Sequence, residues 1–352
     1  MNTKYEEMVD AGVYVDHSLV IDMLNKRVNT VNNQLCVSRP HGFGKSVDVH
    51  MLVACYSQGC NTADVFDQLK ISKMDSYKKH LNSHHVIYLD MKAFYQETHQ
   101  VANMLEMINE RGCEELVNAF PDVRYFEKKR LPRVLTDINS QKLISFIFIM
   151  DHYNCMFEEK PYDLEGHKLY LFFLQALLRD RPYVALAYMT GVMPMKRQSI
   201  CNMFEEVSML QSGPFAPYMG FTEMDMNELC PDQGIKTKLK EWYGGYHMND
   251  QVMLYSPASV MQALKYHQYK CYRNDVLNMC FDIVGVNNVM DRLLVGCTME
   301  IMTLSFENDR VSLHSIDDVL TLFIHLGYLT YDYKKGCSIP NKEAYLALKQ
   351  EK

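Results

Sequence analysis

The residues with the clearest chemical potential lie at positions 39–46, which read RPHGFGKS. This glycine-containing segment follows the short apolar run 35–38 and precedes the helix-like segment 47–56. Glycines let backbone N–H groups approach a polyphosphate, and the start of a helix adds unpaired donors and the positive end of its dipole. Lys45 would then bridge the β- and γ-phosphate oxygens, and the Ser46 hydroxyl would ligate Mg²⁺. The order of strand, glycine loop and helix therefore predicts a site for nucleotide phosphates.

The start of this loop departs from the common pattern GxxxxGK[ST], because Arg39 occupies the first glycine position. An ordinary glycine turn at the start of a helix is the structural alternative to a phosphate site. An acidic residue in a suitable place favours the phosphate site. The predicted nucleotide-binding residues are Arg39, Pro40, His41, Gly42, Phe43, Gly44, Lys45 and Ser46.

That acidic residue is Asp151, which ends the most hydrophobic strand-like run, 144–151. A carboxylate at the end of a buried parallel strand would lie beside the Mg²⁺ site at the carboxyl edge of the sheet. Asp90 ends a second run, 85–91, and is the competing candidate. We prefer Asp151, together with Ser46, as the magnesium ligand, because its strand is the more complete hydrophobic run.

The elements that must position these side chains alternate between strand-like and helix-like segments. The strand-like runs are 35–38, 85–91, 144–151, 183–190 and, as a fifth, 207–210. They are apolar on both faces, which is typical of a parallel sheet covered on both sides. The segments between them are long enough for crossover helices. The pattern predicts an α/β doubly wound domain.

The C-terminal part has a different character. Residues 223–325 are predicted to be mainly helical, and 315–326 form an amphipathic helix that ends at Gly327. Strand-like segments at 328–333 and 337–340 flank a turn, so the end of the chain resembles a small winged-helix unit. Residues 310–352 carry six basic and five acidic side chains, which favours internal packing or protein contact over DNA binding.

Composition narrows the class of protein. The chain has 352 residues with 36 basic and 43 acidic side chains, a formal net charge of −7, which argues against a general nucleic-acid coat. Its 48% hydrophobic and 22% charged residues suit a globular protein. The 11 cysteines are scattered without a CxxC pair, as in a cytoplasmic protein with reduced thiols. The apolar run 146–150 is far shorter than the roughly 20 residues that span a bilayer, so no membrane insertion is expected.

Several short motifs, in the same order along almost the whole chain, resemble the AAA-ATPase-like family of microbial P-loop proteins. Residues 39–46 resemble its RPRRFGKS loop, in which an arginine normally stands at the first glycine position. The other matching segments are YVDHS at 14–18, VIYLD at 86–90, TGV at 190–192, GFTE at 220–223, WYGGY at 242–246, YSP at 255–257, LGYL at 326–329 and IPNKE at 339–343.

This resemblance implies ATP and Mg²⁺ as ligands and a P-loop NTPase parallel sheet in the order 5-1-4-3-2. It also implies three parts: a P-loop NTPase core at 1–222, a helical lid at 223–309 and a winged-helix-like end at 310–352. Members often carry a C-terminal restriction-endonuclease-like nuclease. About ten residues follow IPN at 339–341, so we expect the nuclease to be lost or supplied in trans by a protein partner.

The chain departs from the family at positions that act in catalysis. The family motif resembles DEYD, in which the first Asp holds Mg²⁺ and the Glu orients or deprotonates water; here it reads DHYN at 151–154. Asp151 is kept, His152 stands at the Glu position and Asn154 at the last. A neutral imidazole accepts protons near pH 7 but differs from glutamate in reach. His152 and Asp151 are the candidate catalytic residues.

A second departure follows the sensor strand, where Thr190 is retained. The family usually has an arginine three residues after the next glycine, and here that position is Pro194. Such an arginine would neutralise charge on the transferred phosphoryl group. Lys196 and Arg197 follow further along, and we take Thr190 and Arg197 as the sensor candidates. In the loop, histidine and glycine at 41–42 replace the family's paired arginines.

These changes retain the groups that bind and lose groups that act mainly in the transition state. Since only transition-state interactions raise kcat, the sequence predicts an ATP-binding switch or regulator with weak or no hydrolysis. One alternative is an active ATPase in which His152 or Asp90 handles the water. A second is a relic protein-interaction module that no longer binds nucleotide.

Overall fold

The computed structural model describes residues 5, 7, 9, 14–195, 203–248, 252–273, 283–308, 311 and 313–351. Its largest sheet has five parallel strands in the order β2-β3-β4-β1-β5. These strands are β1 (Gln34–Ser38), β2 (His85–Asp90), β3 (Phe146–Asp151), β4 (Val184–Gly191) and β5 (Glu205–Val207). The predicted α/β class and the order 5-1-4-3-2 are confirmed.

Burial within this sheet follows position. Every residue of β3 and β4 is buried, because both strands are central and covered on both faces. β2 lies at the edge and is mostly half-buried, so it fits the two-sided pattern less well. β5 occupies 205–207 rather than the predicted 207–210. Its first residue is exposed, so the apolar run marks only its buried end.

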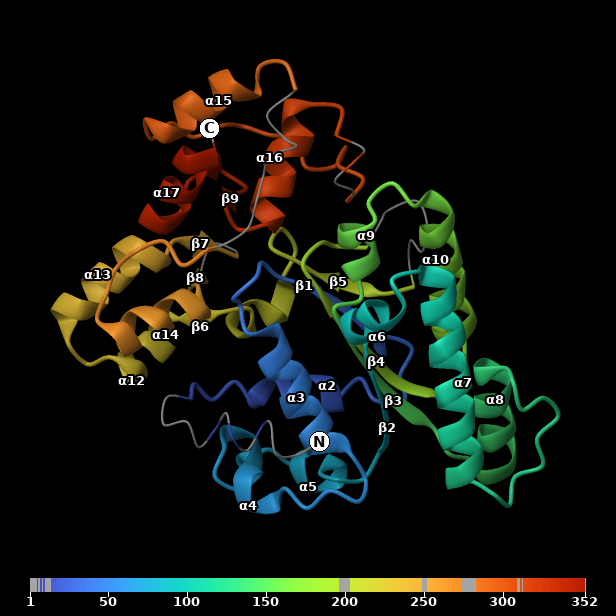
Figure 1. Ribbon diagram of the computed structural model, residues 1–352. Coiled ribbons are helices and arrows are strands. Elements are labelled where there is room, and N and C mark those ends of the chain that lie inside the picture. The colour runs from blue at the N-terminus through green and yellow to red at the C-terminus, as the bar shows by residue number, and fades with distance from the viewer. Residues whose placement is uncertain are drawn as a thin grey trace.

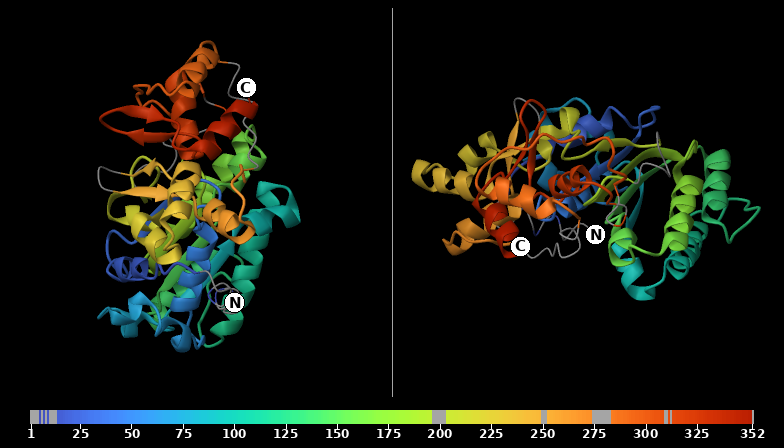
Figure 2. Two further views of the ribbon diagram at one scale, coloured as in Figure 1. Left: turned by 90° about the vertical axis from the view of Figure 1, so that its left-hand side faces the viewer. Right: turned by 90° about the horizontal axis from the view of Figure 1, so that it is seen from above.

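Helices cover both faces of the sheet, as Figures 1 and 2 show. Alternate residues of β3 enter different cores: Ile147 and Ile149 belong to one, and Phe146, Phe148 and Met150 to the other. The first core includes α2 (Leu19–Asn25) and α3 (Lys45–Tyr56), with α4 (Ala63–Phe66), η1 (Lys70–Lys73) and α5 (Tyr77–His80) beyond them. The second includes α6 (Met91–Thr98), α7 (Val101–Ala119), α8 (Leu131–Lys142), α9 (Cys155–Glu159) and α10 (Leu164–Leu178).

The segment after β5 contains a small antiparallel sheet as well as helices. Its strands pair in the order β6-β8-β7 and are β6 (Phe221–Thr222), β7 (Tyr246–His247) and β8 (Met253–Tyr255). The neighbouring helices are η2 (Gly213–Tyr218), α12 (Glu223–Leu229), α13 (Gln233–Tyr243) and α14 (Pro257–Tyr266). The prediction of mainly helices missed this sheet, because strands of two or three residues are too short for an alternating pattern.

The last elements are α15 (Val286–Leu294), α16 (Ile316–His325), β9 (Thr330–Asp332), β10 (Gly336–Ser338) and α17 (Lys342–Glu351). α16 begins with a capping box between Ser315 and Asp318, and Gly327 follows it with φ 76°. β9 and β10 form an antiparallel hairpin, so the predicted succession of helix, strand, turn and strand is present. Throughout the described residues, we find no helix with the length and apolarity needed to cross a membrane.

Candidate functional site

The glycine loop connects the end of β1 to α3, and the helix begins two residues earlier than predicted, at Lys45. Gly42 and Gly44 have φ values of 81° and 88°, a region that favours glycine. The backbone N–H groups of Gly42, Phe43, Gly44 and Ser46 donate to no protein acceptor in the part of the chain that the structure describes. These N–H groups form a set of donors at the N-terminus of a helix, which suits an anion.

The lysine of the loop turns back over the loop itself. Lys45 Nζ donates to the backbone oxygens of Arg39 and Pro40, at 2.8 Å each. Its side chain lines the cavity described below, although the residue is only 7% exposed. The loop therefore holds the ammonium group in place, and the same group is predicted to bind a nucleotide phosphate.

The arginine at the first loop position points into the protein. Arg39 Nη1 donates to Asp48 Oδ2 at 2.7 Å, and the two side chains are 2% and 7% exposed. Burial raises the pKa of the Asp48 carboxyl, and Arg39, His17 and Lys45 oppose that shift. Arg39 thus ties the start of the loop to the first turn of α3. Neither Arg39 nor Pro40 lines the cavity, whereas the predicted residues from His41 to Ser46 do.

Ser46, Asp151 and Thr190 meet although they come from α3, β3 and β4. The Ser46 hydroxyl donates to Asp151 Oδ2 at 2.9 Å, and the Thr190 hydroxyl donates to Asp151 Oδ1 at 2.5 Å. Hydroxyl and carboxylate oxygens are the hard ligands that Mg²⁺ prefers, so these residues fit the ion. The competitor Asp90 instead caps α6, where it accepts from the backbone N–H groups of Lys92 and Ala93.

His152 lies between two carboxylates. Its Nδ1 is 3.5 Å from Asp90 Oδ1 and 3.4 Å from Asp151 Oδ2. The Asp90 carboxylate raises the pKa of His152, partial burial opposes this, and Asp151 reinforces it. Burial of Asp90 is in turn outweighed by its contacts with His152 and the α6 amides, which lower its pKa. A protonated imidazole has only donors, whereas a residue that orients attacking water must accept.

The other positions at which the chain departs from the family do not belong to the group formed by Ser46, Asp151, Thr190 and His152, or lie outside the described residues. Asn154 is buried, and its Oδ1 accepts from the backbone N–H of Val192 at 3.1 Å, so it supports the end of β4. Pro194 lies just beyond, at the end of a described stretch. Lys196 and the sensor candidate Arg197 lie outside the described residues.

A cavity of about 490 Å³ opens over the loop. Its lining includes the residues from His41 to Ser46, together with His152. The rest of the lining is largely apolar and comes from α3 and from segments distant in the sequence: Tyr14, Val15, His17, Val47, Asp48, Met51, Phe221, Pro257, Ala258 and Met261. No binding role was predicted for Tyr14, His17 or Phe221, although all three lie in segments that carried the resemblance.

Comparison with known proteins identifies the family of this chain. The sequence matches the family described as "Predicted AAA-ATPase" over residues 3–201, more than half of the chain. The chain belongs to this AAA-ATPase-like family of P-loop NTPases. None of the curated proteins matches the sequence. Among solved structures, the chain is similar to the Orc1 protein of Aeropyrum pernix in complex with DNA, with 9% identity, a TM-score of 0.36, and coverage of 96% of this chain and 93% of that chain.

In this AAA-ATPase-like chain, the C-terminal half contacts the glycine loop directly. The backbone N–H of Ala258, at the start of α14, donates to the Gly42 oxygen at 2.9 Å. The ring of Phe43 meets that of Tyr246 edge-on, with centroids 5.1 Å apart. A Cβ on Gly327 would lie 2.7 Å from a ring carbon of Pro40. The conformation of the loop is therefore linked to the position of α14 and of the elements around Gly327.

Proposed function

We propose that this AAA-ATPase-like chain is a nucleotide-dependent switch that binds ATP with Mg²⁺ and hydrolyses it slowly or not at all. The unpaired N–H groups of the loop suit a triphosphate, and Lys45 supplies the cation beside them. Ser46 and Asp151 would hold the magnesium ion. The ion would neutralise charge on the β- and γ-phosphates when it is bound.

The observation that carries the slow-hydrolysis part is the placement of His152 between Asp90 and Asp151. A raised pKa keeps the proton on its imidazole at higher pH than usual. Over this wider pH range, the position where the family motif has a glutamate offers a donor where attacking water needs an acceptor. Loss of a group that positions water typically lowers a rate by a factor of about 10²–10⁴. Binding without efficient turnover follows.

The contacts between the loop and the C-terminal half support the switch part. A ligand that seats on the loop N–H groups acts on the same segment that holds Ala258, Tyr246 and Gly327. A ligand shifts an equilibrium only by its different affinity for two states, and these contacts supply a route for such a difference.

The experiment pairs a binding measurement with a turnover measurement. Calorimetric titration of ATP with Mg²⁺ should show binding that Lys45→Ala abolishes and the exposed-surface control Lys142→Ala leaves intact. Phosphate release on the same samples should stay far below about 1 s⁻¹, the lower end of ordinary enzyme turnover. Turnover at about that rate or faster, lost in Asp151→Ala, would overturn the proposal of slow hydrolysis.

An active ATPase is the second candidate, favoured by the contact between Asp90 and the His152 ring. A carboxylate that orients an imidazole can prepare it as a general base once it loses its proton. Hydrolysis would then rise with pH through the pKa of His152 and fall in His152→Ala. A flat and low profile would exclude this candidate.

A relic interaction module is the third candidate, and thermal unfolding tests it. A ligand at 100 times its Kd adds about 2.7 kcal/mol to the free energy of unfolding. We therefore expect millimolar ATP with Mg²⁺ to raise the melting temperature. No shift in the wild-type protein would favour the relic.

A further inference from the structure

The loop between α7 and α8 carries a concentration of positive charge that the nucleotide site does not use. Residues 124–133 read RYFEKKRLPR, with five basic side chains and one acidic, in a chain whose net charge is −7. All five basic side chains are exposed: Arg124, Lys128, Lys129, Arg130 and Arg133. The loop projects from the edge of the molecule, well away from the glycine loop (Figure 1; Figure 2).

An aromatic ring stands among these cations. Phe126 is 71% exposed, although burying such a ring would stabilise the fold by roughly 1.5–3 kcal/mol of free energy. The guanidinium carbons of Arg133 and Arg124 lie 5.2 Å and 6.0 Å from the centroid of its ring. Exposed aromatic and basic side chains side by side are the combination with which proteins hold single-stranded nucleic acids, because bases stack on the ring and cations contact the phosphates.

The backbone of the loop is held in one conformation by hydrogen bonds to the flanking helices. The buried carboxylate of Asp137 accepts from the Phe126 N–H at 2.9 Å. Gln141 binds both the N–H and the oxygen of Arg124, at 2.9 Å each. Asn109 of α7 donates to the Lys129 oxygen and accepts from the Leu131 N–H. The structure therefore fixes the backbone in a form that leaves Phe126 and the cations outside.

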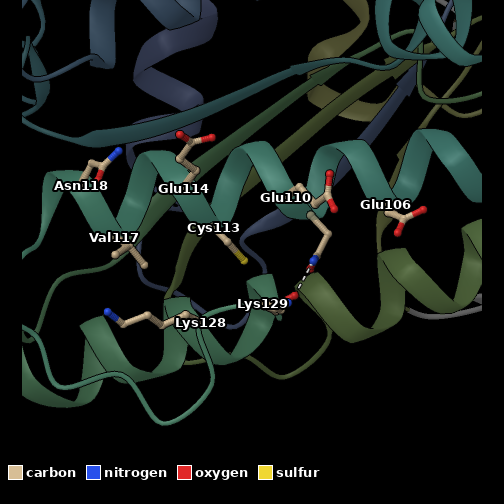
Figure 3. A pocket seen from close by; sticks show the side chains of 9 residues that line it. Glu106, Glu110, Cys113, Glu114, Val117, Asn118, Lys128 and Lys129 are labelled. Carbon is tan, nitrogen blue, oxygen red and sulfur yellow. Dashed lines mark hydrogen bonds between the residues drawn. The ribbon is translucent and has the colours of Figure 1, made fainter.

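The groove beside the loop limits where a polyanion can lie. Figure 3 shows this groove, which has Lys128 and Lys129 on one side and Glu106, Glu110 and Glu114 on α7. Those carboxylates would repel phosphates inside the groove. Arg124, Phe126, Arg130 and Arg133 do not line the groove, so a strand would run along the outer side of the loop.

We propose that residues 124–133 form a binding surface for single-stranded nucleic acid, with Phe126 as the stacking platform and the surrounding arginines as phosphate contacts. The net charge of −7 belongs to the whole chain, and salt at about 0.15 M screens exposed charges beyond about 8 Å, so the strand would respond mainly to the local cations. The surface is separate from the nucleotide site and does not rest on the proposed switch.

Fluorescence anisotropy with labelled 20-nucleotide DNA and RNA single strands, on the full chain, tests the proposal. Phe126→Ala should weaken binding at least about fivefold, the lower limit for loss of one stacked base. The control Phe172→Ala removes a ring that is 67% exposed on α10 and should change nothing. Arg124→Gln/Arg130→Gln should lower the slope of log affinity against log salt by about 0.7 for each phosphate that the variant no longer neutralises.

A matched charge control removes two exposed lysines elsewhere, in Lys78→Gln/Lys79→Gln. It should leave the affinity and the slope near wild type. Circular dichroism melts must show that the variants fold. The proposal is overturned if the strands do not bind, if both charge variants act alike, or if Phe126→Ala has no effect. Equal binding of poly-glutamate, insensitive to Phe126→Ala, would show a surface for acidic polypeptides instead.

Discussion

Replacing Arg39 tests the inward orientation of the first loop residue. In Arg39→Met the side chain keeps most of its length but loses the guanidinium group. Asp48 is then left in the core without its 2.7 Å partner. We expect a large loss of stability, although the variant removes no side chain that lines the cavity.

The magnitude follows from burial. The two side chains are 2% and 7% exposed, so water has little access to the abandoned carboxylate. Removing one partner of such a pair typically costs about 3–5 kcal/mol. We also expect the stability of the variant to depend on pH. Burial already raises the Asp48 pKa, and the variant removes the charge of Arg39 that most strongly opposes this shift. A folded-state pKa above the unfolded value means that the folded state binds more protons, so the variant should regain stability as pH falls.

Urea unfolding at pH 5, 7 and 8 provides the assay. Arg111→Met is the matched control, because Arg111 pairs with Glu97 at the same 2.7 Å but both side chains are about half exposed. That variant should differ little from wild type at any pH. The double variant Arg39→Met/Asp48→Leu should recover much of the loss. A cost below about 1 kcal/mol for Arg39→Met, or a cost equal to that of the control, would refute the inward orientation.

Three further predictions follow from the same geometry. His152→Glu should raise phosphate release by a factor on the order of 10² or more, with Asp151→Ala as the inactive control in the same assay, and an unchanged rate would contradict the proposed role of His152. Because the His152 pKa is raised in the folded protein, its ion pairs should stabilise the protein fully at a pH below the unfolded-state pKa near 6.5. This stabilisation should be lost as pH rises through the folded-state pKa. His152→Asn should therefore flatten this part of the curve of unfolding free energy against pH. Gly245→Ala should lower the melting temperature more than Gly59→Ala does: φ is 86° and 83°, but only at Gly245 would a Cβ meet another atom, 2.2 Å from the Pro340 oxygen.

Local sequence patterns predicted most strands of the main sheet. The runs 35–38, 144–151 and 183–190 are apolar and short, and they became the central strands β1, β3 and β4. The sheet order came from the family resemblance rather than from the strands themselves, since nothing in a strand's own residues says which neighbour it pairs with. The small β6-β8-β7 sheet was missed, because its strands have only two or three residues and because β6 pairs with β8 across more than 30 positions of the chain.

The sequence by itself determined the loop at 39–46 and the run DHYN at 151–154, in which histidine replaces the family's glutamate. Each is a stretch of neighbouring residues, so it can be identified without knowing the fold. The meeting of Ser46 and Asp151 was expected because the carboxyl ends of parallel strands share one edge of a sheet. Only the tertiary structure decided that Arg39 faces Asp48, that His152 stands beside Asp90, and that the cavity lining includes the segments around Tyr14 and Phe221. Burial and charge act through distance in space, which the order of residues along the chain does not specify.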